Sequence, residues 1–71
     1  MKPYLVVCVN NGVVGFIYER ANYTEAVTLA HSLAKKECPG YDDEEIYRQL
    51  EENMEFYDSD VSITLAQTED D

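Results

Sequence analysis

The sequence predicts a single small α+β domain in which two helices pack mainly on one face of a three-stranded sheet. Three observations indicate this fold class: a β-hairpin signal near the start, two capped stretches with helical periodicity, and an alternating stretch near the end. Apolar residues make up 45% of the 71 residues, too many for a disordered acidic segment. We therefore expect one domain over residues 1–71, with residues 67–71 as a frayed tail.

Two β-rich segments, Tyr4–Asn10 and Val13–Glu19, flank the dipeptide Asn11-Gly12. This dipeptide is the strongest short-range signal for a type I′ hairpin, because both turn positions need a positive φ. With a two-residue loop, the expected cross-strand pairs are Val9 with Val14, Cys8 with Gly15, Val7 with Phe16, Val6 with Ile17, and Leu5 with Tyr18. Both faces of this hairpin are largely apolar.

The first helix is expected to begin after Asn22, whose side chain can cap the first turn while Glu25 reaches back to it. The helix should continue to about Glu37, before the stop signal Cys38-Pro39-Gly40. Its apolar positions recur at helical spacing and are Ala26, Val27, Ala30, Leu33 and Ala34.

A second helix should open at Asp42, with Glu45 completing a capping box, and end near Asn53. Its expected buried residues are Ile46, Tyr47, Leu50 and Met54. The alternation over Val61–Ala66 then predicts a third strand, so the element order is β-β-α-α-β.

A right-handed crossover through the helices would place the third strand parallel to the first, giving the sheet order 2-1-3. If Val61, Ile63 and Leu65 share the helix-covered face with Val7 and Phe16, the opposite face is uncovered. The predicted homodimer face is then Tyr4, Val6, Cys8 and Ile17, beside Ser62, Thr64 and Ala66. In the alternative arrangement the two helices lie on opposite sides of the sheet and bury both faces.

The charge of the chain is strongly polarised. Residues 41–71 contain twelve of the fifteen carboxylates against the single base Arg48, a net charge of −11, whereas residues 1–40 have a net charge of +1. Such a field repels nucleic acid and anionic membrane and attracts cationic protein surfaces. The predicted partner-binding carboxylates are Asp42, Asp43, Glu44, Glu45, Glu51, Glu52, Glu55, Asp58 and Asp60, with Tyr41 and Tyr57 as aromatic anchors among them.

No residue pattern indicates catalysis. His31 is the only histidine and has no neighbouring nucleophile or orienting acid in the sequence. The three glycines do not form a phosphate-binding loop, and Asp58-Ser59-Asp60 lacks the ligand spacing of an EF-hand. We expect no enzymatic activity, no cofactor and no metal site.

The sequence therefore favours a cytoplasmic, non-enzymatic module that binds a basic protein surface, with inhibition by imitation of nucleic acid as one mechanism. In size, acidity and compact α+β character, the chain resembles the small phage-encoded anti-restriction and anti-CRISPR inhibitors. That resemblance is one of composition, and it implies a DNA- or RNA-binding protein as the partner. The alternative is a structural or adaptor domain that forms a homodimer through its apolar sheet face, with the acids serving solubility.

Overall fold

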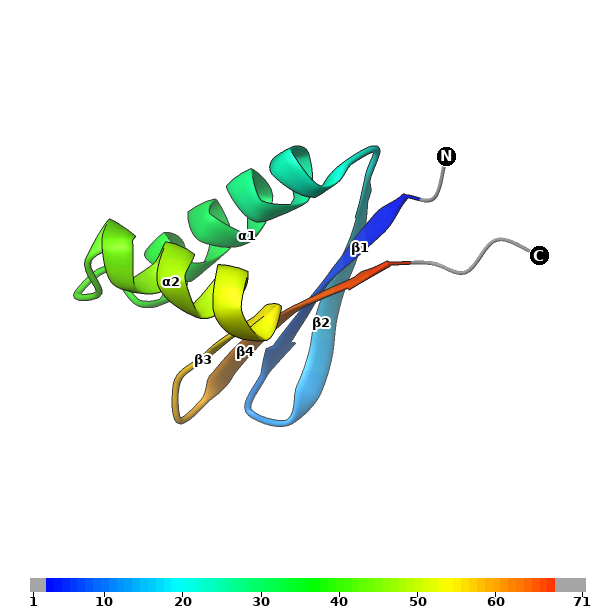
Figure 1. The fold of residues 1–71 in the computed structure, drawn as a ribbon. Coiled ribbons are helices and arrows are strands. Elements are labelled where there is room, and N and C mark those ends of the chain that lie inside the picture. Colours follow the sequence, from blue (N-terminus) through cyan, green and yellow to red (C-terminus); the bar gives the residue numbers. More distant parts are fainter. Residues whose placement is uncertain (1–2, 68–71) are drawn as a thin grey trace.

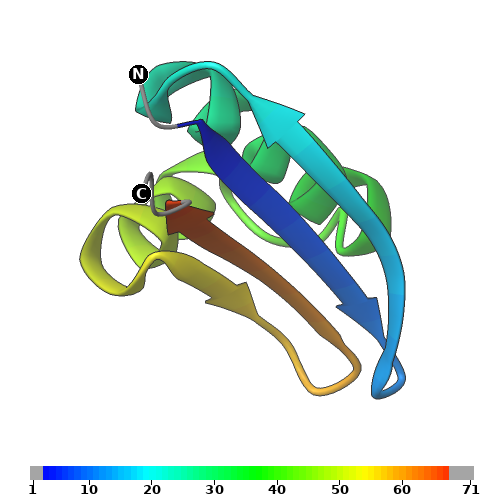
Figure 2. The same cartoon turned by 90° about the vertical axis from the view of Figure 1, so that its right-hand side faces the viewer.

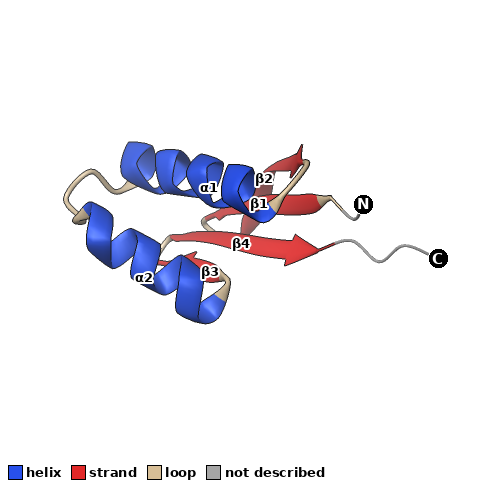
Figure 3. Ribbon diagram, turned by 45° about the horizontal axis from the view of Figure 1, so that its top comes forward, coloured by secondary structure: helices blue, strands red, loops and turns tan. Residues whose placement is uncertain are grey.

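The computed structural model describes residues 3–67 and confirms a small α+β fold with two helices on one face of an antiparallel sheet (Figure 1). The elements are β1 (Tyr4–Asn10), β2 (Val13–Arg20), α1 (Tyr23–Glu37), α2 (Asp43–Asn53), β3 (Glu55–Tyr57) and β4 (Val61–Gln67). The sheet has four strands in the order β2-β1-β4-β3, one more than expected. Figure 3 shows the helices as one layer and the strands as the other, which excludes the alternative with a helix on each side.

The N-terminal hairpin has the predicted turn but not the predicted register. Asn11 and Gly12 have φ values of 54° and 78°, as a type I′ turn requires. Val9 lies opposite Val14 as expected, and a β-bulge then leaves Gly15 without a partner in the ladder. Beyond the bulge every pair is shifted by one residue, so that Cys8 lies opposite Phe16 and Val7 opposite Ile17. The side chains of Phe16 and Ile17 therefore lie on the opposite faces from those expected.

Helix α1 begins and ends where the sequence predicts. The Asn22 side chain accepts a hydrogen bond from the Glu25 backbone N–H at 2.9 Å and donates one to the Glu25 carboxylate at 2.9 Å. Its buried residues are Ala26, Val27, Ala30 and Ala34. Because these side chains are small, the helix axis can approach the sheet closely. Helix α1 contacts β1 and β4 and reaches β2 only in part.

Helix α2 has the predicted span but not the predicted cap. Asp42 is extended and makes no side-chain capping bond. The Glu45 carboxylate does not reach back to it and is bound by Arg48 and Gln49. The helix buries Ile46 and Leu50 against the sheet. Its carboxyl end is closed by Met54, which adopts a left-handed conformation (φ 59°) and donates its N–H to the Leu50 carbonyl at 2.9 Å.

Strand β3 was not predicted, and it reverses the direction of the last strand. The two helices form a hairpin, so a strand leaving α2 directly would run parallel to β1, as the order 2-1-3 assumed. Instead the short strand β3 takes that direction at the edge of the sheet, and the Asp58–Asp60 turn sends β4 back between β3 and β1, antiparallel to both (Figure 2). The expectation of a parallel third strand was therefore wrong, while its position beside β1 was right.

The core lies between the helices and one face of the sheet. In the hairpin, this face is the opposite one from that predicted. Val6 lies opposite Leu65 and Cys8 opposite Ile63, so β4 buries its apolar side chains together with Val6 and Cys8. Phe56 of β3, Ile46 and Leu50 complete the centre of this core with no exposed surface. Placing Val6 and Cys8 on an uncovered dimer face was therefore wrong, because the antiparallel ladder fixes the register the other way.

The open face of the sheet is turned away from both helices (Figure 2). By the register it presents the alternate residues Leu5, Val7, Val9, Val14, Ile17, Glu19, Glu55, Tyr57, Ser62, Thr64 and Ala66. Gln67, expected in the tail, is the last residue of β4, and residues 68–71 of the predicted tail lie outside the described residues.

The left-handed conformation at Gly12 generates the first prediction. We expect Gly12→Ala to lower the free energy of unfolding by about 1 kcal/mol, because a Cβ is disfavoured at positive φ. Urea denaturation measures the difference. Gly40→Ala is the matched control: a Cβ there meets nothing within 4 Å and the φ of Gly40 is not in the left-handed region. Equal effects of the two substitutions would contradict the turn geometry.

Candidate protein-binding surfaces

The acidic residues of α2 divide into those with a cationic partner and those without one. Arg48 binds Glu45 with both carboxylate oxygens within 2.6 Å of one guanidinium nitrogen and reaches Glu52 at 3.4 Å. This contact and that of Gln49 hold the pKa of Glu45 below its usual range. Asp42, Glu44 and Glu51 are exposed and have no cationic partner among residues 3–67. We call these three residues the outer acidic surface.

Asp43 belongs to a cluster that joins the two helices. Its carboxylate lies 2.8 Å from Nε2 of His31 and 3.7 Å from the Lys35 ammonium. The His31 ring stacks on Tyr47 with the centroids 4.4 Å apart and the planes almost parallel. The hydrogen bond from His31 lowers the pKa of Asp43. The cluster docks α2 on α1.

Asp58 joins the β3–β4 turn to the loop between the helices. Its carboxylate accepts hydrogen bonds from the Tyr41 hydroxyl at 3.0 Å and the Cys38 thiol at 3.5 Å. A backbone hydrogen bond from Ser59 and the bond from Tyr41 hold the pKa of Asp58 below its usual range. The same contact raises the pKa of Tyr41, whose ring packs edge-on against Phe56 at 5.0 Å. The side chains of Asp58, Tyr41 and Cys38 therefore hold the turn and the loop together.

The predicted binding residues are therefore not one surface. The Glu55 carboxylate lies on the open sheet face, where it accepts a 2.6 Å hydrogen bond from Ser62. Asp60 is exposed at the turn, and its backbone carbonyl accepts a bond from Asn11 N–H at 2.8 Å. Of the two expected anchors, Tyr41 is half-buried in the loop contact, whereas Tyr57 is 61% exposed on the sheet side.

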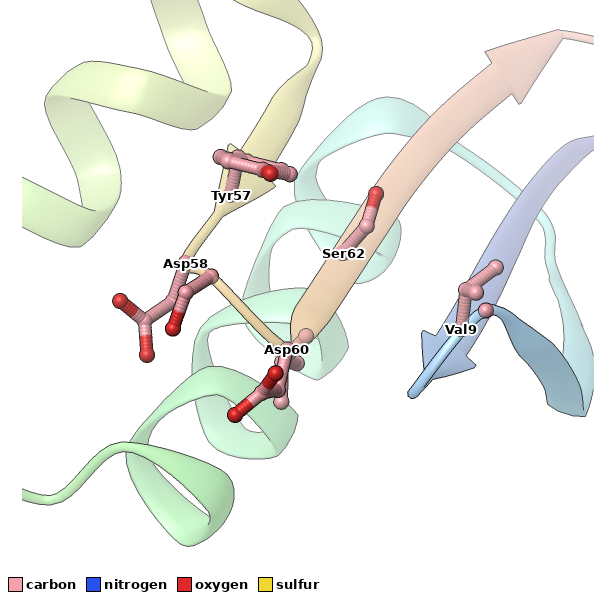
Figure 4. Close-up of a pocket in the computed structure, with 8 residues that line it drawn as sticks. Val9, Tyr57, Asp58, Asp60 and Ser62 are labelled. Atoms are coloured by element: carbon pink, nitrogen blue, oxygen red, sulfur yellow. The ribbon is translucent and has the colours of Figure 1, made fainter.

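A concavity near these acids does not have the form of an active site. It is a shallow hollow of about 220 Å³ beside the β3–β4 turn, lined in part by Val9, Tyr57 and Ser62 (Figure 4). The carboxylate of Asp58 is turned away from it toward the helix loop. Among residues 3–67, no group of three or more metal-ligating side chains converges anywhere. A catalytic site would need convergent polar groups, which this hollow lacks.

The most exposed apolar side chains gather on β2, which sequence reasoning did not single out apart from Ile17. Val13, Val14, Phe16 and Ile17 are each more than half exposed, and we call these four residues the β2 edge surface. Phe16 is on the helix side of the sheet, yet it is 62% exposed because α1 reaches β2 only in part. Phe16 stacks on the neighbouring Tyr18 at 5.9 Å.

The two edges of the sheet differ in composition and length. Strand β3 has three residues, one of them Glu55, and an acidic turn follows it. Strand β2 has eight residues and no charge before Glu19. Natural edge strands are usually short, charged or interrupted, because a long apolar edge invites pairing with another chain. Strand β3 follows that pattern closely, whereas β2 has only the bulge at Gly15 and the charges of Glu19 and Arg20 at its end. The uncharged run over residues 13–18 was the sequence signal for this edge.

Comparison with known proteins gives no relative. No family model, no curated protein and no solved structure matches the chain. No helix within residues 3–67 is long and apolar enough to cross a membrane. Function therefore has to be inferred from the surfaces themselves.

The hydrogen bond between Tyr41 and Asp58 predicts a pH-dependent stability. The folded state lowers the pKa of Asp58, so the stability it contributes is present above the ordinary aspartate pKa and is lost as the pH falls through the folded value. We expect Tyr41→Phe to destabilise the protein at pH 7, because the Asp58 carboxylate loses a hydrogen-bond donor. For the same reason, the loss of stability on acidification should begin at a higher pH in this variant.

Denaturant titrations at pH values from 7 down to about 2.5 measure this effect. Tyr47→Phe is the matched control, because the Tyr47 hydroxyl makes no hydrogen bond within the described part of the chain. A difference between Tyr41→Phe and wild type that stays constant over the whole pH range would show that the Asp58 contact is not its cause.

Proposed function

We propose that this chain is a non-enzymatic protein-binding module that contacts its partner through the β2 edge surface and the adjoining open sheet face. The observation that supports this most directly is the concentration of four exposed large apolar side chains on one edge strand. Single exposed apolar residues are common, but a contiguous group usually marks an interaction site. Beside it, Leu5, Val7 and Val9 extend the apolar surface across β1.

The form of the edge indicates how a partner would bind. An extended segment added to β2 would gain main-chain hydrogen bonds from the strand and apolar contacts on both sides of it. On the helix side it would meet Phe16, and on the open side Val14 and Ile17. Because β2 lies at the edge and α1 reaches it only in part, both sides are accessible at once.

The outer acidic surface is the second candidate. Asp42 precedes α2, Glu44 and Glu51 lie on it about 10 Å apart along the helix, and none of the three has a cationic partner among residues 3–67. A basic site on a DNA- or RNA-binding protein could accept these carboxylates in place of phosphates, so the chain would act as an inhibitor. The geometry favours this less, because Asp43, Glu45 and Asp58 are engaged inside the molecule.

A cytoplasmic location is part of the proposal. Cys8 and Cys38 are both free thiols, which suits a reducing compartment. Burial raises the pKa of the Cys8 thiol, so this cysteine is the inert kind that packs in a core. The strong negative charge opposes direct binding to nucleic acid or anionic membrane.

Parallel capture experiments distinguish the two surfaces. Wild type, Ile17→Lys and the double variant Glu44→Gln with Glu51→Gln are immobilised, exposed to host-cell lysate and eluted with a salt gradient. We expect the wild type and the double variant to retain the same partner throughout the salt gradient. Ile17→Lys should capture at least about tenfold less of that partner, because a buried charge opposes apolar contact.

Ser32→Lys is the control for added charge, since Ser32 is exposed on α1 and its side chain makes no hydrogen bond among the described residues. Captured proteins are identified by mass spectrometry, and folding of each variant is checked by circular dichroism. If the double variant fails to capture the partner while Ile17→Lys still captures it, and the partner leaves the wild type at low salt, the β2 proposal is overturned in favour of the outer acidic surface.

A further inference from the structure

The backbone of β2 offers a defined set of hydrogen-bonding groups to a partner. Asn11 N–H binds the Asp60 carbonyl across the β1–β4 pair, so the odd-numbered residues of β1 direct their backbone groups toward β4. The even-numbered residues therefore face β2 and bond Phe16 and Tyr18. On β2, the backbone groups of Ile17 and Glu19 then point outward.

Ile17 is the better centre for a new pair. The Glu19 carbonyl already accepts a 2.7 Å hydrogen bond from the Arg20 guanidinium, whereas the Ile17 backbone has no such contact. The bulge at Gly15 precedes this stretch, so residues 16–20 form a regular ladder. A strand can therefore pair with β2 around Ile17 without a break.

Charge decides which kind of partner fits this edge. The chain has a net charge of −10, and nine of its fifteen carboxylates lie in residues 42–60, in α2 and the segment from β3 through the β3–β4 turn, which adjoin the other edge of the sheet. The β2 edge itself has Glu19 and Arg20, which cancel. In two copies joined at β2, the two β3 strands would be separated by seven inter-strand spacings, about 34 Å. This distance is about four Debye lengths at physiological salt. Joining copies through β3 would bring these acids together.

We propose that β2 pairs antiparallel with β2 of a second copy, with Ile17 opposite Ile17 at a two-fold axis, joining the two four-stranded sheets into one. In this register Phe16 lies opposite the partner's Tyr18 on the helix side, so the two Phe16–Tyr18 stacks meet and cover the aromatic surface that α1 leaves exposed. Ile17 meets its own copy on the open side. This inference rests on the proposed function and names the partner of the same surface.

The contact is small. One strand pair and a few apolar side chains fall at the low end of interface sizes, below about 1,200 Å² in total. We therefore expect a reversible dimer with a dissociation constant in the micromolar range. Sedimentation of the wild type from about 1 µM to 1 mM should show a monomer that converts to a dimer, and a monomer over the whole range would overturn the proposal.

Single substitutions locate the contact. Ile17→Lys places two like charges together at the axis and should weaken the dimer by about 100-fold or more, while Ser32→Lys should leave it unchanged. Thr64→Lys adds the same charge to the open face of β4, away from the β2 edge. A dimer lost with Thr64→Lys but kept with Ile17→Lys would show that copies pack face to face, which overturns edge pairing.

Crosslinking tests the register. In a Cys38→Ser background, Ile17→Cys should form an intermolecular disulfide under mild oxidation, because directly opposite residues have Cα atoms about 5 Å apart. Glu19→Cys is the matched control at the same edge. In the proposed register Glu19 lies opposite Gly15, so two introduced thiols are about 14 Å apart and should not crosslink. Faster crosslinking at position 19 than at position 17 would overturn the register.

The two proposals fail in different ways. If the wild type stays monomeric but captures a protein that Ile17→Lys does not capture, β2 binds a foreign chain, and only the homodimer is refuted. If the wild type stays monomeric and Ile17→Lys captures the same proteins as the wild type, the β2 edge surface is not an interface and both proposals are refuted. A dimer that Ile17→Lys dissociates supports both.

Discussion

The antiparallel ladder between β1 and β4 determines which side of every other strand is buried. Side chains alternate along a strand, so a shift of one residue would exchange the buried and exposed sets. With Val6 opposite Leu65 and Cys8 opposite Ile63, one apolar set of each strand lies under the helices. Because β1 and β4 are the two central strands, β2 and β3 inherit their faces from this pair. Helix α1 can then pack closely on it, because its buried residues are mostly alanines.

Local signals predicted most of the elements, and the long-range arrangement was beyond them. The turn at Asn11-Gly12 and the cap at Asn22 depend on neighbouring residues alone, so the sequence contains them. Strand β3 is three residues long, too short for a periodic pattern, and it follows a left-handed methionine, Met54, where glycine would have been the expected signal. Since both faces of the hairpin are apolar, composition could not decide which one the helices cover.

The candidate surfaces were only partly predictable for a similar reason. Composition identified the nine carboxylates, but whether one is available depends on partners distant in the sequence. Asp43 is bound by His31, twelve residues away, and Asp58 by Tyr41, seventeen residues away. The β2 edge surface shows the reverse case. Its residues look like ordinary core in the sequence. Phe16 is exposed because α1 lies mainly over β1 and β4, whereas Val14 and Ile17 are exposed because they lie on the open face.

The contrast between the two sheet edges bears on what kind of assembly the fold can support. If both edges were long and apolar, copies could add to each end in turn and form open fibres. Strand β3 prevents this, because it is short and adjoins the acidic turn and helix. Pairing at β2 uses the same surface on both copies and therefore closes after two. In the proposed dimer, repulsion between the acidic residues of α2 and the β3–β4 turn would oppose growth beyond the pair, whether or not these carboxylates also bind a basic protein.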